Sequence, residues 1–88
     1  MTPDIAALLT STGHHITVRA LSGGLRVAAV WQVLMPVARD IERVRIVANG
    51  KLGFEDMTIS FAETFAGSLN TILGQLKKMT WVTTAKLD

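Results

Sequence analysis

The chain has 88 residues, of which 49% are hydrophobic and 18% are charged, and its net charge is +2. This length and composition predict one small globular domain and exclude a disordered chain. The charge is too small to indicate a basic nucleic-acid-binding surface. The absence of cysteine excludes a disulfide framework and a thiolate metal site, and it fits a cytoplasmic location. No apolar run reaches the ~18–20 residues of a membrane span, and the first residues lack the pattern of a signal peptide.

Residues 1–13 are predicted to form a short helical lead-in to the main domain, residues 14–88. Thr2 is a suitable N-cap, and Gly13 can end the helix in a left-handed conformation. The apolar stripe that would pack this helix on the domain consists of Ile5, Leu8 and Leu9.

A first strand is predicted over residues 15–20, where apolar and polar side chains alternate. A glycine turn follows, and residues 25–35 are predicted to form a helix that ends or kinks at Pro36. The side chains spaced to face a core in this helix are Val27, Val30, Trp31 and Leu34.

Two further strands are predicted over residues 41–48 and 51–61. Asn49-Gly50 between them indicates a two-residue hairpin turn in which both residues have a positive φ. The side chains expected on the core face of the later strand are Met57, Ile59 and Phe61.

This tight turn sets a register in which Arg45 lies opposite Phe54. It also places Leu52 and Phe54 on the open face of the sheet, beside Val47. A looser loop through residues 55–56 is the alternative, and it would start the strand later.

A second helix is predicted to begin with Thr64 as its cap and to continue to about residue 79, before a last strand over residues 81–86. Gly74 in its middle costs ~1 kcal/mol relative to alanine, and we expect a close approach to the sheet or to the first helix to compensate. The apolar stripe of this helix consists of Phe65, Leu69, Ile72, Leu73, Leu76 and Met79.

The resulting order, strand–helix–strand–strand–helix–strand, predicts an α+β fold of the ferredoxin-like type. Its sheet has four antiparallel strands and two helices on one face. The other face has no element to cover it, so it is predicted to contact a protein partner or a second copy of the chain, with a simply solvated face as the alternative. The residues predicted at this interface are Arg19, Leu21, Arg43, Arg45, Val47, Leu52 and Phe54, with Thr17, Thr58 and Ser60 on the same face.

Three segments resemble the ACT domain, and most closely the small regulatory subunit of acetolactate synthase. Residues 18–25 (VRALSGGL) resemble the strand end and glycine turn before the first helix of that family. Residues 40–42 (DIE) resemble the opening of its second strand, and residues 68–79 (SLNTILGQLKKM) resemble its second helix. The resemblance covers most of residues 14–88.

This resemblance implies a non-catalytic regulatory protein with no cofactor of its own. It implies a homodimer associated with a catalytic large subunit of acetolactate synthase, which would carry thiamine diphosphate. A small effector, a branched-chain amino acid, would bind where turn amides receive its carboxylate. The residues implied at this site are Ala20, Ser22, Gly23, Gly24 and Leu25, although Ala20 stands where the family has Asp or Asn and cannot hold an ammonium group.

Two other functions remain open on the residues alone. An acylphosphatase-like hydrolase would use Arg26 in the glycine turn to hold phosphate and Asn49 to position water. An RNA-binding module would stack bases on Phe54, but the first strand offers no second aromatic residue. His14 and His15 are adjacent on a strand and would point to opposite faces, so no metal site is expected.

Overall fold

The computed structural model describes residues 14–62 and 66–88. The predicted lead-in helix and the predicted cap at Thr64 lie outside these residues. The elements are β1 (His15–Leu21), α2 (Val27–Leu34), the 3₁₀ helix η1 (Met35–Asp40), β2 (Ile41–Asn49), β3 (Phe54–Phe61), α3 (Ala66–Lys77) and β4 (Val82–Leu87). No helix in the described part is long and apolar enough to cross a membrane.

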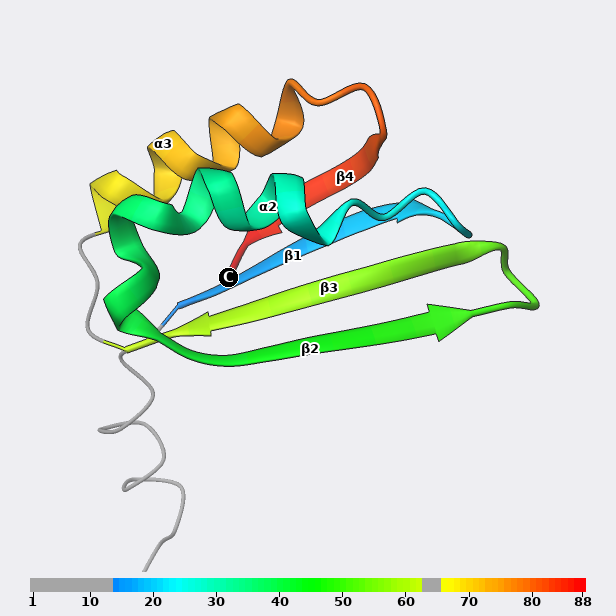
Figure 1. Cartoon of the computed structure of the whole chain (residues 1–88), viewed down its shortest axis with the longest axis horizontal. Coiled ribbons are helices and arrows are strands. Elements are labelled where there is room, and N and C mark those ends of the chain that lie inside the picture. The colour runs from blue at the N-terminus through cyan, green and yellow to red at the C-terminus, as the bar shows by residue number, and fades with distance from the viewer. Residues whose placement is uncertain (1–13, 63–65) are drawn as a thin grey trace, which may run out of the picture.

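The four strands form one antiparallel sheet in the order β2-β3-β1-β4, and both helices lie on one of its faces (Figure 1). This is the ferredoxin-like fold that the order of elements predicts. The helix α3 packs over the β4 side of the sheet, and α2 lies beside α3 (Figure 1). The opposite face of the sheet is bare in the described structure.

The core lies between the sheet and the two helices, and the alternation in β1 explains how it forms. Ile16, Val18 and Ala20 are fully buried on the helix side, as their spacing of two predicts. The other buried apolar residues are Val30, Leu34, Val37, Met57, Ile59, Phe61, Leu69, Ile72, Leu76 and Ala85. Each large side chain in this set contributes about 1.5–3 kcal/mol by its removal from water.

The first helix is shorter than predicted, and one of its expected core residues is exposed. It begins at Val27 after Arg26, whose side chain does not cap it, and it passes into η1, in whose first turn Pro36 lies. Val30 and Leu34 are buried, but Trp31 is 37% exposed. Trp31 follows Val30 by about 100° around the helix, which turns it toward the rim of the core.

The β2–β3 connection differs from the predicted two-residue turn. Asn49 pairs with Phe54, so the loop comprises residues 50–53, and Arg45 lies opposite Thr58 instead of Phe54. Asn49 closes this loop twice, because its Oδ1 accepts the N–H of Leu52 (3.0 Å) and its carbonyl accepts the N–H of Gly53 (2.9 Å).

A positive φ is required in this loop at Gly53 (+76°) and not at Asn49 or Gly50. The alternative of a loop through residues 55–56 is also wrong, since both residues belong to β3. The observed β2–β3 register differs from the predicted one by an even number of residues. Phe54 therefore still lies on the open face of the sheet, as predicted, whereas Leu52 lies in the loop.

Gly74 in α3 has no close neighbour, which corrects the expected close approach. A Cβ built at this position meets nothing within 4 Å, apart from the helix's own neighbouring backbone. The glycine therefore leaves its conformational cost uncompensated.

Replacing Gly74 with alanine is expected to raise the free energy of unfolding by about 0.5–1 kcal/mol. The reason is that alanine loses less backbone entropy in a helix and here has room for its methyl group. Urea denaturation followed by circular dichroism measures the change. An unchanged or lowered stability would contradict the open surroundings of Gly74.

Candidate functional site

The glycine turn after β1 is a type II turn. The carbonyl of Leu21 accepts the N–H of Gly24 (2.7 Å), and Gly23 between them has a φ of +81°. This positive φ is the value that the third position of a type II turn requires, and glycine adopts it without strain. A Cβ at Gly24 would lie 3.1 Å from the Leu21 oxygen, so this second glycine permits the close closure.

The turn is also tied to the β2–β3 loop, because Ser22 donates its N–H to the carbonyl of Gly53 (2.9 Å). Two of the amides that the family resemblance implies for an effector, those of Ser22 and Gly24, are therefore engaged within the chain. In the described part of the chain, the amides of Gly23 and Leu25 donate no hydrogen bond to another backbone group. These two amides are the donors that the turn can offer to a carboxylate.

Ala20 does not add a polar group to this turn. Its side chain is fully buried on the helix side of β1, where it pairs with Glu55 of β3 and Val82 of β4. Leu25 is partly buried against the core. The site implied at the turn therefore consists of backbone amides without a side chain to bind an ammonium group.

The bare face of the sheet, which we call the open face, holds the main polar network of the described structure. Arg19 of β1 donates two hydrogen bonds to the carboxylate of Asp56 on β3, from Nε (2.8 Å) and Nη2 (3.0 Å). Its guanidinium also lies over the ring of Phe54, with Cζ 3.7 Å from the ring centre. The pKa of Arg19 is raised, chiefly by the hydrogen bond to Asp56. Desolvation opposes this rise, and the charge of the carboxylate adds a smaller contribution to it.

Asp56 is a residue that the sequence reasoning did not place on this face. The signal was available, because Phe54, Asp56 and Thr58 alternate along one strand and must share a face. Two further pairs lie beside them, Thr17 with Thr58 (3.3 Å) and His15 with Ser60 (2.9 Å).

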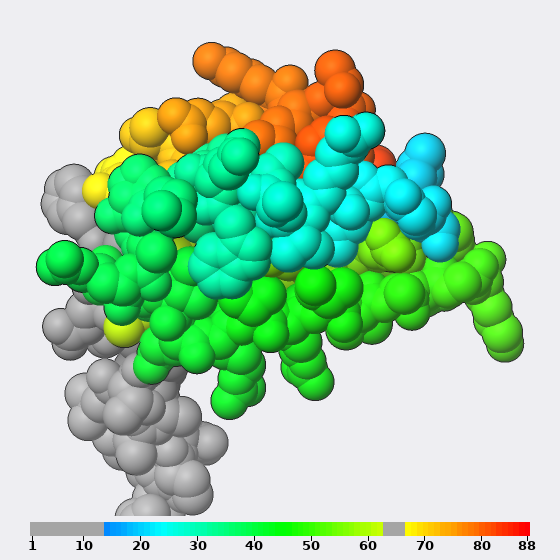
Figure 2. Space-filling model, in the orientation of Figure 1, coloured from blue at the N-terminus to red at the C-terminus, as the bar shows by residue number. Residues whose placement is uncertain are grey.

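The remaining cations of the open face lie toward its edges. Arg43 and Arg45 are exposed on β2, opposite Ser60 and Thr58, and Lys86 on β4 lies opposite Thr17. Within residues 14–62 and 66–88, Arg19–Asp56 is the only ion pair. Long side chains of the β2 segment project from the molecule on the side away from the helices (Figure 2).

A polar hollow of about 310 Å³ lies at the start of β2, lined by His15, Glu42, Arg43 and Ser60. It forms where the pairing of β2 with β3 shifts register between Ile41 and Arg43, which leaves Glu42 as the extra residue of a bulge. Glu42 and Arg43, adjacent at this bulge, therefore line the same hollow.

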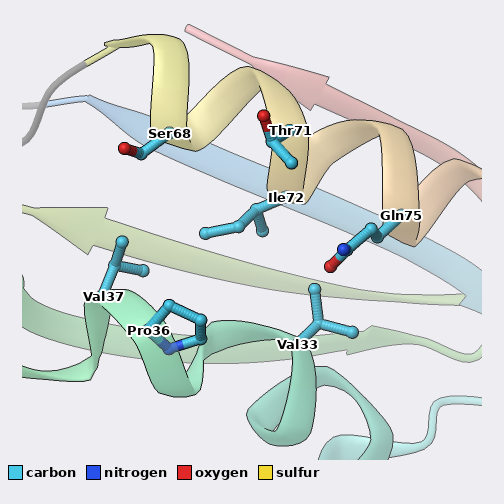
Figure 3. A pocket seen from close by; sticks show the side chains of 7 residues that line it. All are labelled: Val33, Pro36, Val37, Ser68, Thr71, Ile72 and Gln75. Carbon is cyan, nitrogen blue, oxygen red and sulfur yellow. The ribbon is translucent and has the colours of Figure 1, made fainter.

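A second hollow, of about 270 Å³, separates the two helices (Figure 3). Val33, Pro36 and Val37 form one wall, and α3 supplies the other. Figure 3 shows the side chains of Ile72 and Gln75 directed from α3 toward this gap. The hollow is mostly apolar and presents no charged group.

The structure gives little support to the two alternative functions, the acylphosphatase-like hydrolase and the RNA-binding module. The Oδ1 of Asn49 is used within the β2–β3 loop, and Arg26 is exposed before α2. The ring of Phe54 is covered on one side by Arg19, so a base could not stack there without displacing the ion pair. Among the described residues, which include His14 and His15, no cluster of three or more potential metal ligands occurs.

Comparison of the sequence with models of protein families and with curated proteins finds no match. Several solved structures have a similar fold. An uncharacterized protein of Thermotoga maritima has a TM-score of 0.65 at 15% identity, over 86% of this chain and 92% of that chain. The ACT domain of the GTP pyrophosphokinase of Chlorobium tepidum has a TM-score of 0.57 at 16% identity, over 86% and 96% of the two chains.

The C-terminal domain of the MgtC protein of Mycobacterium tuberculosis is a third, with a TM-score of 0.61 at 10% identity, over 86% of this chain and 84% of that chain. At these identities the likeness concerns the fold alone. The chain has an ACT-like fold, with the strand order and helix placement described above.

Proposed function

We propose that this chain is a non-catalytic regulatory subunit of the ACT type and that the enzyme it regulates is acetolactate synthase. The observation that supports the proposal is the glycine turn at the end of β1, within an ACT-like fold. This turn lies in residues 18–25, the segment that resembles the strand end and glycine turn of the family. The open face and the exposed edge of β2 then offer surfaces for other subunits. In this role the chain would act through an allosteric coupling between its own ligand and the partner enzyme.

The proposed effector is a branched-chain amino acid whose carboxylate accepts the amides of Gly23 and Leu25. Calorimetric titration of the chain with valine, leucine and isoleucine tests this directly. We expect saturable binding that Gly23→Ala weakens, because the substitution distorts the turn. Absence of heat with all three amino acids would contradict the effector site and leave the subunit role to be decided by association with the enzyme.

The proposed homodimer uses the β2 edge of the sheet. On the helix side of this edge strand, Ile46 is 50% exposed. Trp31 of α2 and Met35 at the start of η1 are 37% and 68% exposed. Val33 faces α3 across the hollow between the helices. Trp31 precedes Val33 by two residues and so lies about 200° from Val33 around α2, which directs Trp31 away from α3 and toward the β2 side. A second copy paired along β2 would cover these apolar groups and the unpaired strand edge.

Replacing Ile46 with lysine is expected to raise the dimer dissociation constant by about tenfold or more, because a charge would be buried at the proposed interface. Sedimentation velocity over a range of concentrations measures it. Leu21→Lys is the control, since Leu21 is also an exposed apolar strand residue (68% exposed, against 50% for Ile46) but lies on the open face. A larger effect from Leu21→Lys would place the dimer on the open face instead.

A further inference from the structure

The polar groups of the open face divide into a satisfied middle and an unsatisfied β2 side. In the middle, Arg19 is held by Asp56 at 2.8 and 3.0 Å, and Thr17 lies 3.3 Å from Thr58. On the β2 side, Arg43 and Arg45 have no carboxylate within ion-pair distance among the residues described. Two of the open-face cations without a carboxylate partner in the described structure therefore lie along β2, and Lys86 lies apart from them on β4.

These two arginines have a spacing suited to acidic side chains. They alternate on one strand, so their Cα atoms are about 7 Å apart, which matches alternate residues of an extended chain. Arg43 also lines the polar hollow, together with His15 and Ser60, whose side chains are hydrogen-bonded to each other (2.9 Å). A carboxylate placed there could accept from Arg43 while a second one meets Arg45.

We propose that the β2 side of the open face, formed by Arg43, Arg45 and the hollow beside Arg43, is a docking surface for an acidic segment of a partner protein. The identity of that partner, the catalytic subunit, rests on the proposed function. The acidic character of the docking segment is inferred from charge complementarity with the two arginines. Glu42 in the same hollow opposes a bound carboxylate, so it tunes the affinity downward.

Two other occupants fit the face less well. A second copy bound face to face would bring two surfaces together that each carry Arg43, Arg45 and Lys86 without carboxylate partners in the described structure. A single-stranded nucleic acid needs aromatic surfaces for its bases, and one side of the Phe54 ring is already covered by Arg19.

The first test uses the full chain and a fluorescein-labelled decaglutamate peptide, with binding followed by fluorescence anisotropy at low salt. We expect Arg43→Gln with Arg45→Gln to weaken binding by about tenfold, and Glu42→Gln to strengthen it. Lys77→Gln with Lys78→Gln, which removes the same charge from exposed positions at the end of α3, is the matched control and should change affinity less than about twofold.

Three outcomes would overturn the proposal: no binding of decaglutamate, an equal loss in the two double variants, or tighter arginine-dependent binding of a ten-nucleotide single-stranded RNA. The same variants are then tested for association with the acetolactate synthase large subunit. If the large subunit binds wild type and the arginine variant equally, the docking surface is wrong and the proposed function stands. If decaglutamate binds as expected but the large subunit does not, the proposed function is wrong and the acidic docking surface stands.

Discussion

Replacing Phe61 with alanine is expected to lower the free energy of unfolding by about 3–5 kcal/mol. Phe61 is among the largest fully buried side chains and is 1% exposed. It ends β3 on the helix side, where it belongs to the same core cluster as Leu69 of α3 and Val37 of η1. A domain of this size has a total stability of about 5–15 kcal/mol, so the variant should be partly unfolded at 37 °C.

Urea denaturation followed by far-ultraviolet circular dichroism measures this loss. Leu52→Ala is the control, because Leu52 is an apolar side chain of the β2–β3 loop that is 69% exposed. Its replacement should change stability by less than about 0.5 kcal/mol. A small effect from Phe61→Ala would mean that the core does not lie between the sheet and the helices as described.

Replacing Gly23 with alanine is expected to cost about 1–2 kcal/mol of stability, the second-largest effect that we predict. The backbone at Gly23 has a φ of +81°, and in this left-handed region the Cβ of an L-residue crowds the carbonyl oxygen next to it in the chain. A turn that relaxes to a negative φ would lose the 2.7 Å hydrogen bond from Gly24 to Leu21. The variant should therefore lower the midpoint of thermal unfolding.

Gly50→Ala is the matched control for this prediction. Gly50 lies in the loop at the same end of the sheet, has no positive φ and has nothing within 4 Å of a built Cβ. Its replacement should leave the unfolding midpoint nearly unchanged. Equal losses in the two variants would show that the type II turn is not the feature that requires glycine.

The sequence predicted the fold because its hydrophobic periods are consistent over the described chain. Alternation in β1 identified Ile16 and Val18 as core residues, and the spacing of Leu69, Ile72 and Leu76 identified the buried stripe of α3. In both elements the spacing of the apolar residues along the sequence identifies the face that is buried. The order of elements then left few ways to assemble the sheet.

The details that the sequence missed depend on interactions that form only in the folded chain. Asn49-Gly50 suits a two-residue turn, but the side chain of Asn49 instead stabilises a longer loop with Gly53 in the left-handed conformation. Trp31 has helical spacing with core residues, yet its position around α2 directs it to the rim. Gly74 indicated a close contact, and the open space around it becomes visible only when the helices are placed.

For the candidate sites, the sequence located the turn and the open face but not their hydrogen bonds. The link from Ser22 to Gly53 joins segments far apart in the chain, so no local pattern reveals that this amide is engaged. The pairing of Arg19 with Asp56 likewise requires the β1–β3 register. That register decides which arginines remain available on the open face.

Reconstitution with the large subunit of acetolactate synthase tests the proposed regulatory role most directly. The purified chain is added in increasing amounts to the large subunit, and the rate of acetolactate formation is measured together with co-elution in gel filtration. The regulatory role predicts that the two proteins co-elute and that the rate changes to a saturating value as the chain is added. A large subunit that elutes alone and has the same rate at every ratio would contradict it.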